Sequence, residues 1–345
     1  MISKIIAQEK INKVADLLDE YEKIVIVTHL SPDGDAIGSS LGLFHYLNNA
    51  GCEVTVITPN SFPDFLKWMK GANDILNFEK YPEYAEKLIH DAEIIFCLDF
   101  NEPKRIQGMS SLVENASAKK VLIDHHPDPA DFCDIVISHP DISSTSELVF
   151  RLICRMGDFD VISKESAEAI YAGMMTDTGG FTYNSNNEEI YYIIGELLKK
   201  GIDKDQIYAN VYHNYSAERF RMMGYILLEK MKIFAEYRTA LIWLNKEELS
   251  QFNAQKGDTE GFVNIPLSIH KIVFSVFMRE DEGLIKISFR SSGKFPCNTF
   301  ASRYFNGGGH YNASGGEFYG TIEDAIAIFE KALPEYVNQV RQQKI

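Results

Sequence analysis

Short apolar runs that alternate with helical patterns constrain the fold of this chain more than any other feature. The first half contains four such runs: KIVIVTH (23–29), EVTVITP (53–59), EIIFCLDF (93–100) and KKVLIDHH (119–126). Runs of this length and composition are typical of buried strands, and helical segments separate them. The pattern predicts an α/β fold whose parallel sheet is covered by helices. In such sheets, ligands bind outside the carboxyl ends of the strands.

The second half has a different pattern. From about Ser143 it becomes helical, with predicted helices that end near Gly157, begin at Ser163 and end near Gly201. A further helix, at about 216–235, is predicted to connect two domains. Strands are predicted beyond it at 238–245, 271–280 and 283–292, the last two as an antiparallel hairpin across Asp-Glu-Gly, and a closing helix from about Ile322. These elements predict a second, smaller α+β domain.

Composition excludes several classes of protein. The chain has 34 basic and 49 acidic residues, so its net charge of −15 repels polyanions and leaves no basic surface for a long nucleic-acid duplex. No stretch approaches the roughly 20 apolar residues of a membrane span. The five cysteines are scattered without a CxxC pair, as in reduced thiols of the cytoplasm. We therefore expect a cytoplasmic protein that does not bind membranes.

The segment His29-Leu-Ser-Pro-Asp33-Gly-Asp35 carries the strongest chemical signal. It follows an apolar strand and precedes a helix that starts near Ala36, and its proline and glycine force a tight turn. An imidazole and two carboxylates can therefore converge at the edge of the sheet. Crowded carboxylates repel one another, and a bound divalent cation relieves this repulsion. Turn and capping chemistry is the alternative, because aspartate commonly precedes helices.

Other strand ends deliver the same kinds of side chain. Asp99 ends one apolar run and Asp124-His125-His126 ends another, while Asp177 lies in a glycine-flanked bend after a helical run. Carboxylates and imidazoles without cysteine suit Mn²⁺ or Mg²⁺ better than structural zinc, with Fe²⁺, Co²⁺ and catalytic Zn²⁺ as alternatives. The ligands suffice for two ions that share a carboxylate, an arrangement that hydrolyses phosphate esters.

Together these motifs resemble the DHH phosphoesterases, and the later GGGH segment (307–310) resembles their DHH-associated C-terminal domain. The resemblance covers nearly the whole chain and is closest to the bifunctional oligoribonuclease and phosphoadenosine-phosphate phosphatase subgroup. It implies one metal ion on His29, Asp33 and Asp99. It implies a second ion on Asp35, Asp99, His125 and Asp177, so that Asp99 bridges the two.

The resemblance also assigns roles beside the metals. It places His126 next to the substrate or its leaving group, with Asp99 and Asp124 completing the catalytic set; Asp124 would orient a neighbouring imidazole. It divides the chain into a metal-binding catalytic domain (1–190), a helical linker (191–236) and a substrate-binding domain (237–345) across a cleft. Closure of the two domains would complete the site.

The C-terminal domain offers candidates for substrate binding. Strand alternation in LIKISFRSS directs Arg290 away from the apolar face, where its guanidinium suits a terminal phosphate, and Ser291 follows it. Gly308 and Gly309 allow backbone amides to approach an anion, with His310 as a further donor. The alternatives are a solvated strand arginine and a flexible glycine turn.

These features predict a metal-dependent phosphoesterase, with Mn²⁺ as the favoured ion and Mg²⁺ or Co²⁺ as alternatives. Short single-stranded RNA or DNA oligonucleotides, the 3′-phosphate of phosphoadenosine phosphate and linear dinucleotides such as pApA all fit the site. A long processive nuclease is disfavoured because the chain lacks a further basic domain. The GGGH segment argues against an inorganic pyrophosphatase. A non-enzymatic nucleotide sensor is the alternative from another class, and assembly into a homo-oligomer is left open.

Overall fold

The computed structural model describes residues 3–255 and 257–342. Their contacts divide the chain into two compact units, Met1–Asn214 and Tyr215–Ile345. Each unit has its own sheet and its own hydrophobic core. Among the described helices, none is both long and apolar enough to cross a membrane.

A parallel sheet forms the centre of the first unit, as the apolar runs predict. Its strand order is β3-β2-β1-β4-β5-β6, and every neighbouring pair is parallel. The strands are β1 (Lys23–Thr28), β2 (Glu53–Thr58), β3 (Leu76–Asn77), β4 (Ile94–Leu98), β5 (Lys119–Asp124) and β6 (Ile135–Ser138). The four predicted strands are confirmed, whereas the short edge strands β3 and β6 were not predicted.

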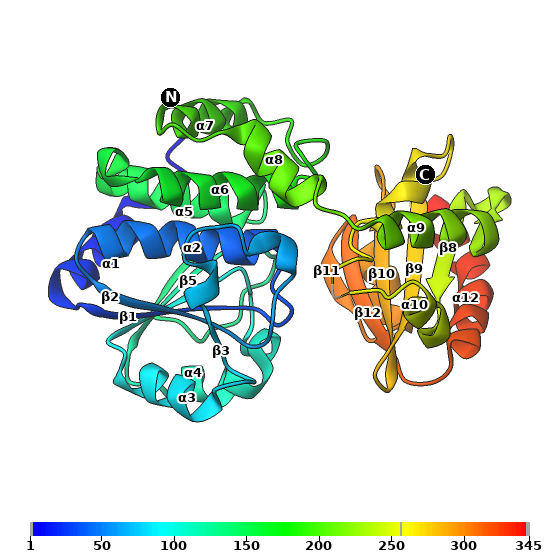
Figure 1. The fold of residues 1–345 in the computed structure, drawn as a ribbon, viewed down its shortest axis with the longest axis horizontal. Helices are drawn as coiled ribbons and strands as arrows, with labels where there is room; N and C mark the ends of the chain where they lie inside the picture. Colours follow the sequence, from blue (N-terminus) through cyan, green and yellow to red (C-terminus); the bar gives the residue numbers. More distant parts are fainter. Residues whose placement is uncertain (1–2, 256, 343–345) are drawn as a thin grey trace. The chain divides into compact units, whose positions relative to one another are not determined.

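Helices cover both faces of this sheet (Figure 1). Successive residues of β1 alternate between the two cores: Ile24 and Ile26 pack on one side, Val25 and Val27 on the other. The first core is covered by α1 (Gln8–Glu20), α2 (Gly34–Asn49), α5 (Thr145–Met156), α6 (Lys164–Asp177), α7 (Glu188–Lys199) and α8 (Lys204–Tyr212). The second core is covered by α3 (Pro82–Asp91), η3 (Pro103–Met109) and α4 (Ser110–Asn115). The unit also contains three short 3₁₀ turns: η1 (Asp64–Leu66), η2 (Ala72–Asp74) and η4 (Phe159–Val161).

Close contact between α2 and α6 positions the chemistry of this unit. A Cβ atom added to Gly38 would lie 2.6 Å from the carbonyl oxygen of Ala169 and 2.7 Å from Cα of Gly173. Glycine therefore lets the two helix backbones touch. This contact brings the first turn of α2, which carries Asp35, beside the end of α6, which carries Asp177.

The second unit is a mixed sheet with helices on both faces. Its strand order is β11-β12-β10-β9-β8-β7; only β8 and β9 are parallel. The strands are β7 (Met231–Phe234), β8 (Thr239–Leu244), β9 (Phe274–Asp281), β10 (Leu284–Ser291), β11 (Gly308–His310) and β12 (Ala313–Phe318). The helices are α9 (Ala217–Glu229), η5 (Ala235–Tyr237), α10 (Lys246–Gln251), η6 (Phe262–Ser268), α11 (Cys297–Tyr304) and α12 (Ile322–Gln342). The predicted β9–β10 hairpin is confirmed.

The segment predicted as one connecting helix at 216–235 differs in the structure. Helix α9 ends at Glu229, and Met231–Phe234 forms strand β7 at the edge of the second sheet. Apolar residues of α9, such as Met222 and Ile226, pack in the second unit, whereas α7 and α8 pack in the first. Strand β7 has four residues and no alternation in burial, since Lys232 and Ile233 are both exposed, so periodicity does not separate it from a helix end.

Candidate metal centre

The candidate residues of the first unit gather where the strand order changes direction. The chain passes from β1 to β2 on one side and from β4 to β5 on the other, so the carboxyl ends of β1 and β4 form a topological switch point. His29 follows β1, Asp99 follows β4, and Asp124 ends β5. The structure therefore brings together side chains from three neighbouring strands, as the sequence suggested.

One group of side chains combines His29, Asp33 and Asp99. The Nε2 atom of His29 lies 3.4 Å from Oδ2 of Asp99 and 3.8 Å from Oδ1 of Asp33. His29 and Asp99 are buried, whereas Asp33 is exposed at the start of α2. One ligand atom from each residue lies within 4.8 Å of the others, the spacing that a single cation requires.

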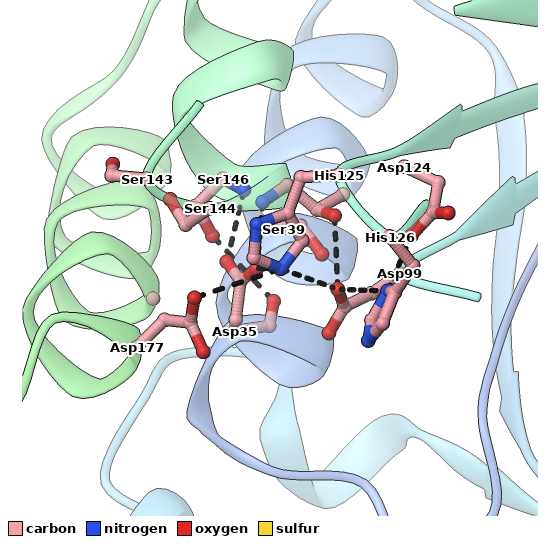
Figure 2. Close-up of polar contacts among 12 residues, drawn as sticks. Asp35, Ser39, Asp99, Asp124, His125, His126, Ser143, Ser144, Ser146 and Asp177 are labelled. Atoms are coloured by element: carbon pink, nitrogen blue, oxygen red, sulfur yellow. Dashed lines mark hydrogen bonds and ion pairs between the residues drawn. The ribbon is translucent and has the colours of Figure 1, made fainter. Parts of the chain in front are cut away.

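A second group combines Asp35, His125 and Asp177. Figure 2 shows His125 between Asp177 and Asp99, with Asp35 beside it. The Nε2 atom of His125 lies 3.6 Å from Asp177 Oδ2, 3.6 Å from Asp99 Oδ1 and 3.9 Å from Asp35 Oδ2. Asp99 thus directs Oδ2 to the first group and Oδ1 to the second.

The hydrogen bonds of the imidazoles test whether these groups suit cations. Nδ1 of His29 lies 2.9 Å from the carbonyl oxygen of Leu30, and Nδ1 of His125 lies 3.2 Å from that of Ile142. A carbonyl oxygen only accepts, so each Nδ1 carries the proton and donates it. In the neutral ring, Nε2 then directs a lone pair at carboxylate oxygens, which bear lone pairs themselves. A cation between them fits this arrangement of donor atoms.

The electrostatics of both groups favour added positive charge. Burial opposes the imidazolium form of His29, but hydrogen bonds to Asp33 and Asp99 outweigh it and raise its pKa to about 10. For His125, burial is likewise outweighed by the charges of Asp177 and Asp99, which raise its pKa to about 9. Burial raises the pKa of Asp177 to about 6. Divalent cations supply the same positive charge without protons.

Asp99 is also unusual in its backbone. Its φ of 65° lies in the left-handed region, which aspartate tolerates better than most side chains but at some cost in free energy. Its amide nitrogen donates to the carbonyl oxygen of Ile123, which holds the chain in this bend. Although burial opposes the charged form, the hydrogen bond from His29 and the nearby imidazolium charges hold the pKa of Asp99 below its ordinary value.

Asp124 and His126 form a separate pair beside the two groups. Nδ1 of His126 donates to Oδ1 of the fully buried Asp124 over 2.7 Å, and the same ring lies 3.9 Å from Asp99 Oδ1. Asp124 therefore fixes the orientation of the His126 ring.

The first turn of α5 contacts both groups and was not among the candidates predicted from the sequence. The hydroxyl of Thr145 donates to Asp99 Oδ1 over 2.9 Å, and its backbone amide donates to Asp35 Oδ2 over 2.6 Å. The amide of Ser146 donates to Asp35 Oδ1 over 2.9 Å. Helix N-termini favour negative charge, and here they hold a buried carboxylate. The hydroxyl-rich run Ser-Ser-Thr-Ser at a helix start was the available signal.

The candidates of the second unit lie on β10 and β11. Arg290 is partly buried on β10, and one of its guanidinium nitrogens, Nη1, donates to the carbonyl oxygen of Phe289. Ser291 is buried; its hydroxyl donates to the carbonyl oxygen of Phe295 and accepts from Asn312. The Ser291 hydroxyl is therefore engaged within its own domain.

The glycine-rich segment forms an edge strand instead of an open loop. Residues Gly308–His310 are β11, which pairs with β12. A Cβ on Gly309 would lie 2.8 Å from the carbonyl oxygen of Ala313, and φ of Gly309 is 134°. A side chain at this position is therefore excluded by the close approach of β12.

Two family models match this chain, one in each unit. Residues 23–174 match the DHH family, N-terminal domain, and residues 238–339 match the DHHA1 domain. The chain is 30% identical to a bifunctional oligoribonuclease and PAP phosphatase NrnA of Thermus thermophilus, over 94% of this chain and 93% of that protein.

Two solved structures resemble the fold of this chain. A crystal structure of an exopolyphosphatase-related protein from Bacteroides fragilis is 61% identical, with a TM-score of 0.95 over 99% of this chain and 100% of that chain. RecJ from Thermus thermophilus, solved with Mn²⁺, is 14% identical, with a TM-score of 0.53 over 97% of this chain and 55% of RecJ. The likeness to RecJ is one of fold.

Proposed function

This chain belongs to the DHH family, and from that premise we propose that it is a two-metal phosphoesterase that cleaves short oligoribonucleotides and removes the 3′-phosphate of phosphoadenosine phosphate. The observation that carries this proposal is the convergence of imidazole Nε2 atoms and carboxylate oxygens around Asp99. The names of the curated relatives support the substrate class.

We assign His29, Asp33 and Asp99 to one cation and Asp35, Asp99, His125 and Asp177 to the other, with Mn²⁺ as the ion and Mg²⁺ or Co²⁺ as alternatives. The grouping of the side chains supports this assignment. Two such cations lower the pKa of an attacking water and offset the charge that develops on the phosphate.

The remaining chemistry belongs to the side chains themselves. The carboxylate of Asp124 holds the His126 ring in one orientation. His126 then stands beside the reacting phosphate, where it stabilises the leaving oxygen. The hydroxyl of Thr145 donates to the Asp99 carboxylate and so fixes its orientation between the two groups of side chains.

The substrate's distal phosphate is assigned to Arg290 and the edge strand Gly308–His310. A guanidinium offers five N–H donors, of which one is directed at the Phe289 carbonyl oxygen. The outer edge of β11 offers backbone groups in addition. A net charge of −15 favours short substrates, because few phosphates then need to be neutralised.

A parallel assay tests the proposal. The wild-type protein with Mn²⁺ is given phosphoadenosine phosphate, linear pApA, a 5′-labelled RNA pentamer and inorganic polyphosphate, the last because of the name of the 61%-identical relative. We expect mononucleotides from pApA and the pentamer and inorganic phosphate from phosphoadenosine phosphate. The Asp99→Ala variant should release none of these, whereas Asp131→Ala, at an exposed aspartate of the same unit, should match the wild type. Stoichiometric nucleotide binding without turnover would instead favour a sensor.

A further inference from the structure

Exposed aromatic rings lie on the turn that directly follows Asp177. Helix α6 ends at Asp177, and Gly179 and Gly180 follow with φ values of 56° and 71°. Gly179 and Gly180 lie two and three residues beyond Asp177, spans of at most roughly 7 and 11 Å, so this glycine turn adjoins Asp177. Whatever contacts the turn is therefore a near neighbour of the candidate metal centre.

Tyr183 lies directly on this turn. A Cβ atom added to Gly179 would lie 2.2 Å from Cε1 of the Tyr183 ring, so glycine is needed for the ring to rest on the backbone. The side chain is nevertheless 46% exposed. One side of the ring is thus supported by the turn, while much of its surface meets solvent.

Tyr208 faces the other glycine of the turn. A Cβ on Gly180 would lie 3.5 Å from Cε2 of Tyr208, which is ordinary contact distance. The ring is held by Tyr212 at 4.8 Å and by His213 at 5.3 Å between ring centroids, and it is 42% exposed. The neighbouring rings restrict its rotation, so Tyr208 presents a preorganised aromatic surface.

We propose that Tyr183 and Tyr208 form a stacking surface for a nucleobase of the substrate whose phosphate is held at the metal centre. This inference rests on the proposed function and identifies how the first unit recognises the nucleoside part. Every base has a π-face, so stacking on tyrosine binds nucleotides with little sequence preference. Such a surface also adds affinity that does not depend on basic residues, which acidic residues outnumber in this chain.

Substrate and protein variants together test this surface. The Tyr183→Leu, Tyr208→Leu and double variants are compared with a control variant, Tyr84→Leu. Tyr84 is 58% exposed and belongs to α3, a helix that packs on the opposite side of the sheet. Each protein is given 5′-phosphorylated diadenylate and a 5′-phosphorylated dinucleotide in which abasic tetrahydrofuran residues replace both nucleosides. The kinetic constants are measured with Mn²⁺.

We expect the double variant to lower kcat/KM for diadenylate by roughly 5- to 100-fold, mainly through KM, and to leave the abasic dinucleotide almost unchanged. The wild type should prefer diadenylate by a similar factor, and this preference should vanish in the double variant. Tyr84→Leu should match the wild type on both substrates.

Other outcomes distinguish failure of the stacking surface from failure of the proposed function. If the wild type cleaves diadenylate and the double variant does so equally well, or loses both substrates equally, the stacking surface is overturned while the proposed function stands. A changed sedimentation coefficient of the double variant would overturn it too, in favour of a contact between protein chains. If the wild type cleaves neither dinucleotide and releases no phosphate from phosphoadenosine phosphate, the proposed function itself fails. Quenching of 2-aminopurine emission in a bound dinucleotide, retained in Tyr84→Leu and lost in the double variant, provides a readout independent of turnover.

Discussion

At the scale of single residues, the position of Asp33 suits both alternatives that the sequence offered for it. Asp33 is the N-cap of α2, because its Oδ1 accepts hydrogen bonds from the amides of Asp35 and Ala36, and the same oxygen lies 3.8 Å from Nε2 of His29. Capping and metal binding were alternatives for this motif in the sequence. In the structure the two are compatible, because a carboxylate oxygen has more than one lone pair.

Replacement of Asp99 by asparagine keeps the shape of the side chain but removes its charge. Because Asp99 lies within 3.9 Å of three imidazoles, we expect Mn²⁺-dependent hydrolysis to fall at least roughly 100-fold, as when one electrostatic group is lost from a catalytic site. The melting temperature without metal should stay close to that of the wild type. Asp131→Asn is the control, and substantial activity of Asp99→Asn would contradict the assigned role.

The hydroxyl of Thr145 provides a subtler test. Thr145→Val preserves the backbone hydrogen bond to Asp35 and the side-chain volume but removes the hydrogen bond to Asp99. We expect Mn²⁺ affinity, measured by titration calorimetry, to weaken roughly 10- to 100-fold, as for other groups that orient metal ligands. Thr145→Ser should restore most of this affinity. A valine variant that binds Mn²⁺ like the wild type would show that the hydroxyl has no such role.

At the scale of secondary-structure elements, the position of the candidate metal centre depends on close contact between helix backbones. Helices α2 and α6 carry Asp35 and Asp177, and glycines at their crossing set the distance between them. Helix α5 adds its N-terminal amides. The site is therefore held by three packed helices and three strand ends.

Gly38→Ala tests this helix contact. The added methyl group would lie 2.6 Å from a backbone oxygen of α6, so the helices must separate. We expect a loss of about 1–3 kcal/mol in the free energy of unfolding, measured in urea, together with weaker Mn²⁺ binding. Gly195→Ala in α7, where nothing lies within 4 Å, should be neutral or more stable by up to about 1 kcal/mol. Equal stability of the two variants would argue against the close contact.

At the scale of the whole molecule, the chain forms two units with separate cores. All assigned metal ligands lie in the first unit, and the assigned phosphate-binding residues lie in the second. A ligand that binds only the folded form of one unit stabilises that unit alone. Bound metal should therefore stabilise the first unit more than the second.

Mn²⁺ should raise the unfolding temperature of the first unit by mass action. At one hundred times the dissociation constant the stabilisation is about 2.7 kcal/mol. The chain has two tryptophans, Trp68 in the first unit and Trp243 in the second. Fluorescence melting of Trp243→Phe should report a metal-dependent shift, and that of Trp68→Phe a smaller one. EDTA should reverse the shift, and an equal shift of both would contradict separate responses.

The sequence by itself determined the parallel sheet of the first unit and the chemistry at its edge. Apolar runs specify buried strands, and the carboxyl ends of parallel strands lie at one edge, so His29, Asp99 and Asp124 were expected at the same edge of the sheet. The strand order β1-β4-β5, which makes them neighbours, was decided by the tertiary structure. The β9–β10 hairpin was equally predictable, because its strands are adjacent in the chain. Local sequence patterns are sufficient to predict a structural feature whose contacts are local or follow from strand direction.

Only the tertiary structure decided the features that depend on distant residues. Thr145 lies 46 residues from Asp99 and 110 from Asp35, so no local pattern pairs them. The left-handed backbone of Asp99, the strand β7 within a predicted helix and the strand β11 within a glycine run also depend on neighbouring strands and helices. Packing between segments far apart in the chain selects one local conformation among several that the sequence allows.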